Sequence, residues 1–307
     1  MIVDCFTHTW DSTKQLGRCL PANGRVIEFR SESKFPLDAG SSRHLAATQT
    51  ATATFVLGFK SDYLDADIPN DQVAAFVAHH PNRLIGFAGI DPSRPKEAIT
   101  EMRRARKELN MLGVAVAPAA QDFHPSNSQA MRVYAEACAL GLPVLFHSGV
   151  HLAAATKLEY AHPILLDEVA RELPDLRIVI AHLGYPWVAE TIALLAKHTN
   201  VFSEISWIPQ HTWDGYQALL SAYQRGVMDK LLLGSGFPYS TTSHCIEALY
   251  GINHLCHGTN LPTIPREHLR GIVERDTLAL LKITDRTNPA IPPAQSLPSP
   301  DETDETI

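Results

Sequence analysis

A short apolar run recurs eight times along the chain, and this recurrence constrains the fold more than any other feature of the sequence. The runs are continuously apolar rather than alternating, as in "TFVLGF" and "LRIVIAHLG". Strands that are covered on both faces have this character, so the runs predict a parallel sheet. They lie at 1–8, 54–59, 83–90, 112–118, 142–149, 176–184, 200–207 and 229–236.

Seven of the runs are followed by a segment with apolar residues at three- and four-residue steps, the spacing of a helix that buries one face. Ala189, Ile192, Ala193 and Ala196 are one example. Eight strand–helix units in roughly 280 residues predict an α/β fold of the (β/α)8 TIM-barrel type. A doubly wound open sheet is the alternative. No GxGxxG motif follows the first run, which disfavours the nucleotide-binding form of that alternative.

Two segments depart from the strand–helix rhythm. Residues 10–50 are polar with scattered Gly and Pro, and we expect a cap-like first loop over the barrel mouth, with a small hairpin in it. Residues 284–307 are rich in Pro and carry five acidic side chains and one basic one, so we expect a disordered tail. The barrel itself is then expected to span residues 1–283.

Charge and composition exclude several classes of function. The net charge is −7 and no basic stripe is interleaved with aromatic residues, which argues against nucleic-acid binding. The N-terminus lacks the pattern of a secretory signal, and no run of about 18 apolar residues predicts a membrane span. The five cysteines are scattered, as in a protein with reduced thiols. We therefore expect a cytoplasmic protein that acts on a small molecule.

Polar side chains close several of the apolar runs. Active sites of TIM barrels lie at the C-terminal ends of the strands. His8, His147 and His182 each end a run there, and Glu204 and Ser206 end another. Strand alternation predicts four sets of side chains that each share one face: Asp4 with Phe6 and His8, Leu145 with His147, Ile178 and Ile180 with His182, and Phe202 with Glu204 and Ser206.

Three imidazoles at one mouth would suit zinc or a similar divalent ion. A single histidine at a strand end is more commonly a hydrogen-bonded structural residue, and the convergence of three carries the metal hypothesis. The other twelve histidines, His44 among them, have no comparable placement, and most are expected at the surface.

Five segments together resemble one known family. "LPVLFHSG", "LPDLRIVIAHLGYPW", "NVFSEIS", "DKLLLGSGFPYS" and "IVERDTLALLKI" occur in the order seen in the amidohydrolase superfamily. The resemblance is to the branch of aminocarboxymuconate semialdehyde decarboxylase and related hydrolases, and it covers about residues 1–283. It implies a (β/α)8 barrel. It also implies a homodimer, because proteins of this branch are dimeric.

The resemblance also implies a metal shell, in which two positions are altered here. The branch opens with Asp-x-His-x-His, and in "DCFTH" His8 matches the second histidine while Phe6 occupies the first. His147 matches the metal-binding histidine of the fifth strand, and His182 matches the histidine of the sixth, which faces substrate or metal. The eighth strand normally reads Gly-Ser-Asp-x-Pro, but here the sequence is "GSGFP", and Gly236 occupies the position of the aspartate. We expect a weakened zinc-type site, or none.

These residues support two hypotheses of function. In the first, the protein is an amidohydrolase-type enzyme that hydrolyses or decarboxylates a small organic acid or ring compound. His182 and Glu204 would be catalytic, and His8 and His147 would hold a metal or the substrate. The substrate-binding residues would be Phe6, Ser206, Trp207 and Phe237. In the second, the protein is a non-catalytic ligand-binding pseudoenzyme on the same barrel. Glu204 within bonding reach of His8 and His147 would indicate a rebuilt site, whereas a Glu204 that points elsewhere would favour the pseudoenzyme.

Overall fold

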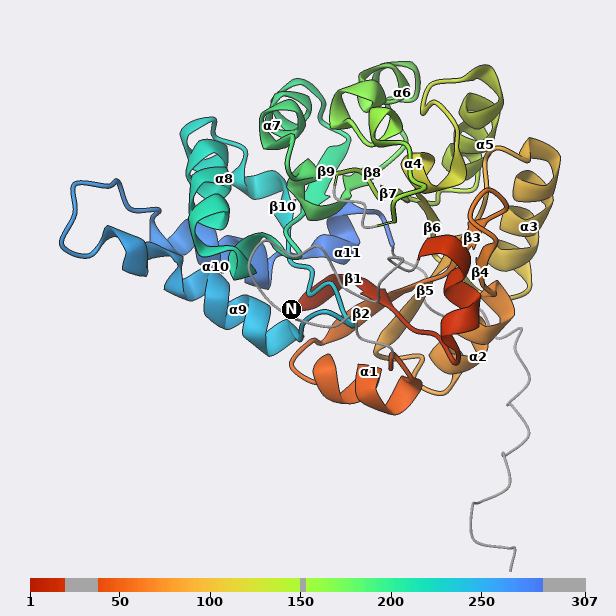
Figure 1. The fold of residues 1–307 in the computed structure, drawn as a ribbon, viewed down its shortest axis with the longest axis horizontal. Helices are drawn as coiled ribbons and strands as arrows, with labels where there is room; N and C mark the ends of the chain where they lie inside the picture. The colour runs from red at the N-terminus through yellow and green to blue at the C-terminus, as the bar shows by residue number, and fades with distance from the viewer. Residues whose placement is uncertain (20–37, 150–152, 284–307) are drawn as a thin grey trace, which may run out of the picture.

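The computed structural model describes residues 1–19, 38–149 and 153–283, and eight parallel strands form its centre (Figure 1). Each strand pairs in parallel with the next in the order β1-β2-β5-β6-β7-β8-β9-β10. The strands are β1 (Val3–His8), β2 (Ala53–Leu57), β5 (Leu84–Gly89), β6 (Gly113–Val116), β7 (Val144–Phe146), β8 (Ile178–Ile180), β9 (Val201–Glu204) and β10 (Leu231–Leu232).

Backbone hydrogen bonds join the last strand and its following loop to the first strand. Cys5 N–H donates to Leu233 O at 2.9 Å, Gly236 N–H donates to Phe6 O at 3.0 Å, and His8 N–H donates to Phe237 O at 3.0 Å. These bonds bring the loop after β10 against β1, so the ring of strands closes as a barrel. The prediction of a (β/α)8 fold is confirmed.

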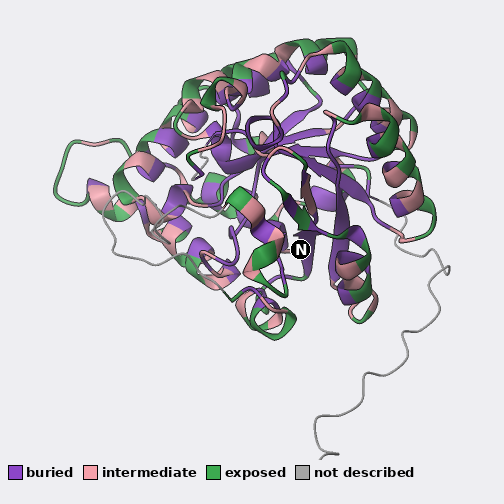
Figure 2. Ribbon diagram, turned by 45° about the vertical axis from the view of Figure 1, so that its right-hand side comes forward, coloured by how far each residue is buried: buried purple, intermediate pink, exposed green. Residues whose placement is uncertain are grey.

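Helices surround the strands, and the side of each helix that faces the strands is buried, as the colouring of Figure 2 shows. No helix in the described ranges is long and apolar enough to cross a membrane. The α-helices are α1 (Ser41–Ala47), α2 (Asn70–Ala78), α3 (Pro95–Lys107), α4 (Pro118–Gln121), α5 (Ser128–Ala139), α6 (Asp167–Glu172), α7 (Val188–Lys197), α8 (Thr212–Gln224), α9 (Thr242–Gly251), α10 (Arg266–Glu274) and α11 (Thr277–Leu280).

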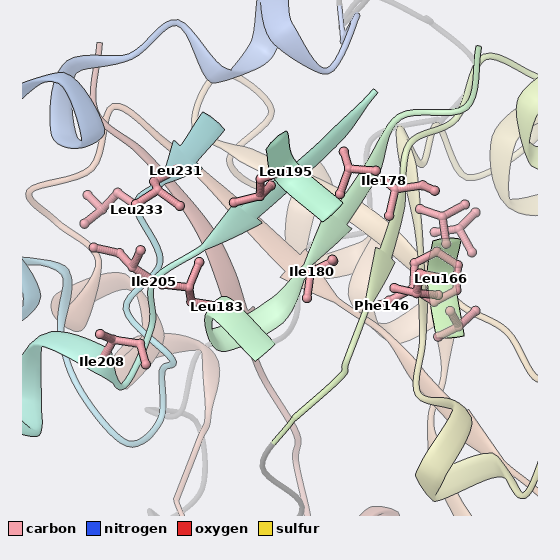
Figure 3. Close-up of a cluster of buried hydrophobic side chains, with 14 of the residues drawn as sticks. Phe146, Leu166, Ile178, Ile180, Leu183, Leu195, Ile205, Ile208, Leu231 and Leu233 are labelled. Atoms are coloured by element: carbon pink, nitrogen blue, oxygen red, sulfur yellow. The ribbon is translucent and has the colours of Figure 1, made fainter. Parts of the chain in front are cut away.

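Two apolar layers explain why the strand sequences are apolar without alternation. One layer fills the barrel and includes Phe55, Leu145 and Val179. The other lies between the strands and the helices, where Ile178 and Ile180 of β8 belong to the same cluster as Leu195 of α7 (Figure 3). Both faces of each strand are therefore buried, as the continuous apolar runs predict.

The segment 10–50 is only partly a loop. Residues 13–19 form the 3-10 helix η1 (Thr13–Cys19), and 41–47 form the regular helix α1, which supplies the first helix of the barrel. The segment 20–37, where the expected hairpin would fall, lies outside the described residues, as does the tail 284–307. An unpredicted hairpin, β3 (Phe59–Ser61) and β4 (Ala66–Ile68), follows β2.

Two of the four predicted facing sets are wrong, because the backbone interrupts the strand alternation. The pairing of β1 with β2 shifts register between Asp4 and Thr7, so Cys5 and Phe6 both join the barrel interior while Asp4 turns to the loop after β10. A bulge of this kind reverses alternation downstream. After β8, His182 adopts φ 57°, which separates its direction from that of Ile178 and Ile180.

Candidate functional site

A cavity of about 140 Å³ lies at the C-terminal ends of the strands, where a TIM barrel places its active site. Six of the predicted site residues line it: Phe6, His8, His147, His182, Trp207 and Phe237. The cavity also has an apolar wall that was not predicted, formed by η1 and the β3–β4 hairpin. Leu16, Cys19, Phe59, Leu64 and Ile68 contribute to this wall.

The phenyl ring of Phe6 lies among the three predicted histidines. Its centroid is 5.2 Å from that of His8, 5.6 Å from that of His147 and 4.6 Å from that of His182. His147 and His182 are themselves 4.9 Å apart by ring centroids. The convergence of the histidines is therefore confirmed, and an apolar ring occupies the space between them.

His8 is held as a neutral imidazole. Burial lowers the pKa of His8 to about 4, and the hydrogen bond to the Leu57 carbonyl opposes this only in part. The bond joins His8 Nδ1 to Leu57 O at 3.2 Å, so Nδ1 carries the proton. The acceptor atom of the ring is then Nε2, and His8 offers the cavity a hydrogen-bond acceptor rather than a charge.

Glu204 and Ser206 do not line the cavity but lie fully buried behind His182. Glu204 Oε1 accepts from the backbone N–H of His182 at 2.6 Å and from Ser206 Oγ at 2.9 Å. Its Oε2 accepts from Ser206 N–H at 2.7 Å. Ser206 Oγ also lies 2.7 Å from His182 Nδ1, and since its one proton goes to Glu204, it accepts the Nδ1 proton.

This network holds His182 in a strained conformation. His182 and Leu183 have φ of 57° and 49°, a region that costs side-chain-bearing residues roughly 1–2 kcal/mol each. Gly234 gives the carboxylate its space, because a Cβ there would lie 2.0 Å from Glu204 Oε2. Strain of this sort persists where surrounding contacts determine it, and it clusters at functional sites.

Burial raises the pKa of Glu204 to about 7, with a smaller upward contribution from the charge of Asp4. The hydrogen bonds from His182 N–H and from Ser206 act in the opposite direction, because they stabilise the carboxylate. Glu204 therefore changes its charge near neutral pH while it is bonded to His182.

Trp207 fills the space that a side chain at residue 236 would need. A Cβ on Gly236 would lie 2.7 Å from both Cδ1 and Nε1 of the indole. Trp207 itself has φ 72°, and its ring lies 4.6 Å from that of Tyr239 by centroids. Its buried Nε1 has no hydrogen-bond partner among the described residues. Gly236 and Trp207 thus form one packing unit.

Among the described residues, the side chains at the mouth form no recognisable set of ligands for a divalent metal. In the parts of the chain that the structure describes, no three His, Cys, Asp or Glu side chains gather so that they could hold a metal ion. Phe6 lies between the imidazoles, and both oxygens of Glu204 accept hydrogen bonds from His182 and Ser206. Glu204 therefore directs both of its oxygens at His182 and Ser206, the outcome that favours the pseudoenzyme by the criterion given above.

One buried polar residue near the site, His44, was missed, and a second, Asp4, was placed on the wrong face of its strand. His44 was expected at the surface, but it is fully buried on α1, and its Nε2 lies 2.8 Å from Thr7 Oγ1. Asp4 accepts from Ser235 N–H at 2.8 Å and from Thr242 Oγ1 at 2.6 Å, so it ties β1 to the loop that carries Gly236. His44 has no strand-end signal in the sequence, and the partners that decide the direction of Asp4, Ser235 and Thr242, lie far along the chain.

The chain resembles proteins of known family. A family model described as amidohydrolase matches residues 3–291. Gamma-resorcylate decarboxylase from Polaromonas sp. (strain JS666 / ATCC BAA-500) is 24% identical over 222 residues, which is 58% of this chain and 67% of that protein.

Solved structures share the fold at low identity. An uncharacterized TIM-barrel protein from Bordetella bronchiseptica superposes with a TM-score of 0.66 at 20% identity, covering 92% of this chain and 98% of that one. A dihydroxybenzoic acid decarboxylase from Polaromonas sp. JS666, with bound manganese and the inhibitor 2-nitroresorcinol, gives a TM-score of 0.62 at 16% identity and covers 92% and 97%. Because the family model spans nearly the whole barrel, the chain belongs to the amidohydrolase family.

Proposed function

We propose that this protein is an enzyme that hydrolyses or decarboxylates a small ring compound, with His182 as the general acid–base group and without a tightly held divalent metal. The observation that carries the proposal is the hydrogen-bonded series from Glu204 through Ser206 to His182, which ends at the cavity. A carboxylate that holds one ring nitrogen protonated leaves the other nitrogen as the base, the arrangement used in acyl-transfer sites.

In hydrolysis, His182 would take a proton from a water molecule while the water oxygen bonds to the substrate carbonyl carbon. The bond from that carbon to the leaving oxygen would then break, and the proton would pass from His182 to the leaving oxygen. In decarboxylation, protonated His182 would give its proton to the ring carbon, and that carbon's bond to the carboxylate would break as CO2 departs.

Glu204 and Ser206 serve as positioning residues in this scheme, because neither reaches the cavity. A divalent metal has no step in it, since Phe6 lies among the imidazoles and Trp207 fills the space at Gly236. The manganese in the Polaromonas decarboxylase belongs to that protein's site.

The same two packing features favour the second candidate, a pseudoenzyme that binds a ligand without turnover. In that case the Glu204–Ser206–His182 series would only stabilise the barrel mouth. Both candidates predict that the cavity binds a ligand, and only the enzyme predicts turnover of that ligand.

The test is turnover of aromatic esters, lactones and hydroxybenzoates, measured by chromatography, together with elemental analysis of metal in the same preparation. We expect turnover by protein that holds well under one metal per chain, and its loss in His182→Gln. His79→Gln, on the exposed end of α2, is the matched control and should retain full activity. Folded protein with no turnover of any substrate would favour the pseudoenzyme, and activity that tracks added metal would refute the metal-free scheme.

A further inference from the structure

The cavity at the mouth of the barrel has a size, a lining and buried neighbours that bear on the charge of the ligand it can hold. We propose that the site takes an uncharged six-membered ring compound with a carbonyl group, and that it rejects the corresponding carboxylate. This deepens the proposed function, on which it rests, because it selects hydrolysis of a neutral ester or lactone over decarboxylation of an acid.

The size of the cavity suits one ring. Its volume is about 140 Å³, and an apolar protein cavity of about 150 Å³ holds a benzene molecule. Aromatic side chains form much of the surface around that volume, with Phe6, Trp207 and Phe237 among them. A flat ring would pack edge-to-face or offset against such side chains.

No formal charge lines the cavity among the described residues. Its polar groups include three imidazoles, Thr156 and Tyr239, with no Lys, Arg, Asp or Glu. The described basic residues next to the lining in sequence have other partners: Lys157 pairs with Asp122 at 2.5 Å, Lys60 pairs with Asp67 at 2.8 Å, and Arg18 donates to the Tyr63 carbonyl. A carboxylate in the cavity would thus meet no cation from these residues.

Two buried carboxyl groups bonded to residues of the cavity wall make an anion still less favourable. Glu204 and Asp4 are both fully buried, each with 0% relative solvent accessibility. Each ionised carboxylate there would repel a second negative charge placed in the cavity, in surroundings that screen charge poorly. Burying a carboxylate without a counter-charge is costly, whereas a neutral carbonyl needs only a hydrogen-bond donor.

Hydrolysis of a neutral ester or lactone in this cavity would produce an anion. The water oxygen bonds to the carbonyl carbon, the bond to the ester oxygen breaks, and His182 carries the proton from the water to that oxygen. The product is a carboxylic acid, which ionises at neutral pH and is then an anion in this cavity. The same charge that disfavours acids as substrates therefore favours release of the product.

Three probes of similar shape test the proposal: benzamide, methyl benzoate and benzoate. Their dissociation constants would be measured by calorimetry on the full chain at about pH 8, where ordinary imidazoles are neutral. We expect each neutral probe to bind at least about tenfold more tightly than benzoate. Thr156 is half-buried at the wall, so Thr156→Lys would add a cation there, and it should narrow or reverse the preference. Thr156→Met, of similar length and no charge, should leave the preference unchanged.

Each outcome decides the matter. Tighter binding of the neutral probes, with reversal only in Thr156→Lys, supports the proposal. Equal or tighter binding of benzoate overturns it, and so does a benzoate preference that appears only when zinc or manganese is added. Failure of all three probes to bind overturns the assignment of a single-ring ligand. Because these are binding measurements, an absence of turnover would count against the proposed function and leave this result standing.

Discussion

At the scale of single residues, the proposed chemistry depends on buried groups that do not line the cavity. Glu204 contacts His182 through the backbone and through Ser206, and its pKa lies near neutrality because it is buried. A small change of pH therefore alters the group that fixes the protonated nitrogen of His182. His44 is a second buried group of this kind, with a pKa displaced in the opposite direction.

Glu204→Gln should lower the turnover number by about two orders of magnitude, the usual contribution of an oriented acid–base group. The amide keeps the shape of the carboxyl but is uncharged, and it has one accepting oxygen in place of the two that accept from Ser206 and His182. In the unmodified protein, the rate should fall as pH drops through about 7, since protonated Glu204 no longer accepts the Ser206 proton. The measurement is the pH profile of the turnover number, from which this step should vanish in the variant. An unchanged profile would assign Glu204 a purely structural role.

His44 should make the fold sensitive to acid. Burial, together with the charges of Arg83 and His8, lowers the pKa of His44 to about 3, below its ordinary value of 6.5. The unfolded chain then binds the proton more readily, so this contribution to stability is complete above about pH 6.5 and is lost as pH falls toward about 3. His44→Phe should cost about 1 kcal/mol at pH 7 through the lost bond to Thr7, yet flatten the decline in acid. Urea unfolding at several pH values checks both, and an equally steep decline would contradict the assignment.

At the scale of elements, the loop after β10 and the turn after β9 are one unit, because Gly236 and Trp207 share one space. Asp4 ties this loop to β1, and Phe6, on the same strand, lies among the histidines. Restoring the metal shell implied by the family therefore requires changes in β1, in the turn after β9 and in the loop after β10, because the side chains at these three places pack together.

Phe6→His with Gly236→Asp should raise zinc binding only modestly while Trp207 remains. The new Asp side chain would begin 2.7 Å from the indole, so the ring must move before the carboxylate can reach the histidines. Adding Trp207→Gly, which suits φ 72°, should bring occupancy toward one zinc per chain. Elemental analysis under equal zinc supply would compare the two variants, with Phe6→His alone as the control. Full occupancy of the unmodified protein would show that other groups complete the shell.

At the scale of the whole molecule, α11 and the residues directly after it pack against the interior of the barrel. Leu278, Leu281 and Ile283 belong to the same buried cluster as the interior strand residues. The described fold thus uses the chain up to Ile283, and the Pro-rich acidic segment begins directly after it.

A truncation that ends at Thr284 should keep its melting temperature, because the removed segment has too few apolar residues to contribute a packed surface. A truncation that ends at Asp276 removes the side chains of Leu278, Leu281 and Ile283, each worth about 1.5–3 kcal/mol of burial. It should melt on the order of ten degrees lower or not fold at all. Calorimetric melting of the two truncations decides this. A large drop for the first would show that the tail packs against the barrel.

The sequence predicted the fold well because its signal is local and repeated. Each apolar run needs only its own residues to indicate a strand buried on both faces, and eight of them with intervening helices fit a barrel. The histidines at the strand ends were placed correctly for the same reason. The β3–β4 hairpin was not predicted, since strands of three residues carry too short a pattern.

By itself, then, the sequence determined the barrel, its mouth and the positions of His8, His147 and His182 at the strand ends. Only the tertiary structure decided that Phe6 lies among them, that Glu204 braces His182 from behind, and that Trp207 excludes a side chain at residue 236. The bulge in β1 and the left-handed turn after β8 reverse the directions that alternation predicts. Both arise from pairing and packing between segments far apart in the chain, and a local pattern carries no information about such contacts.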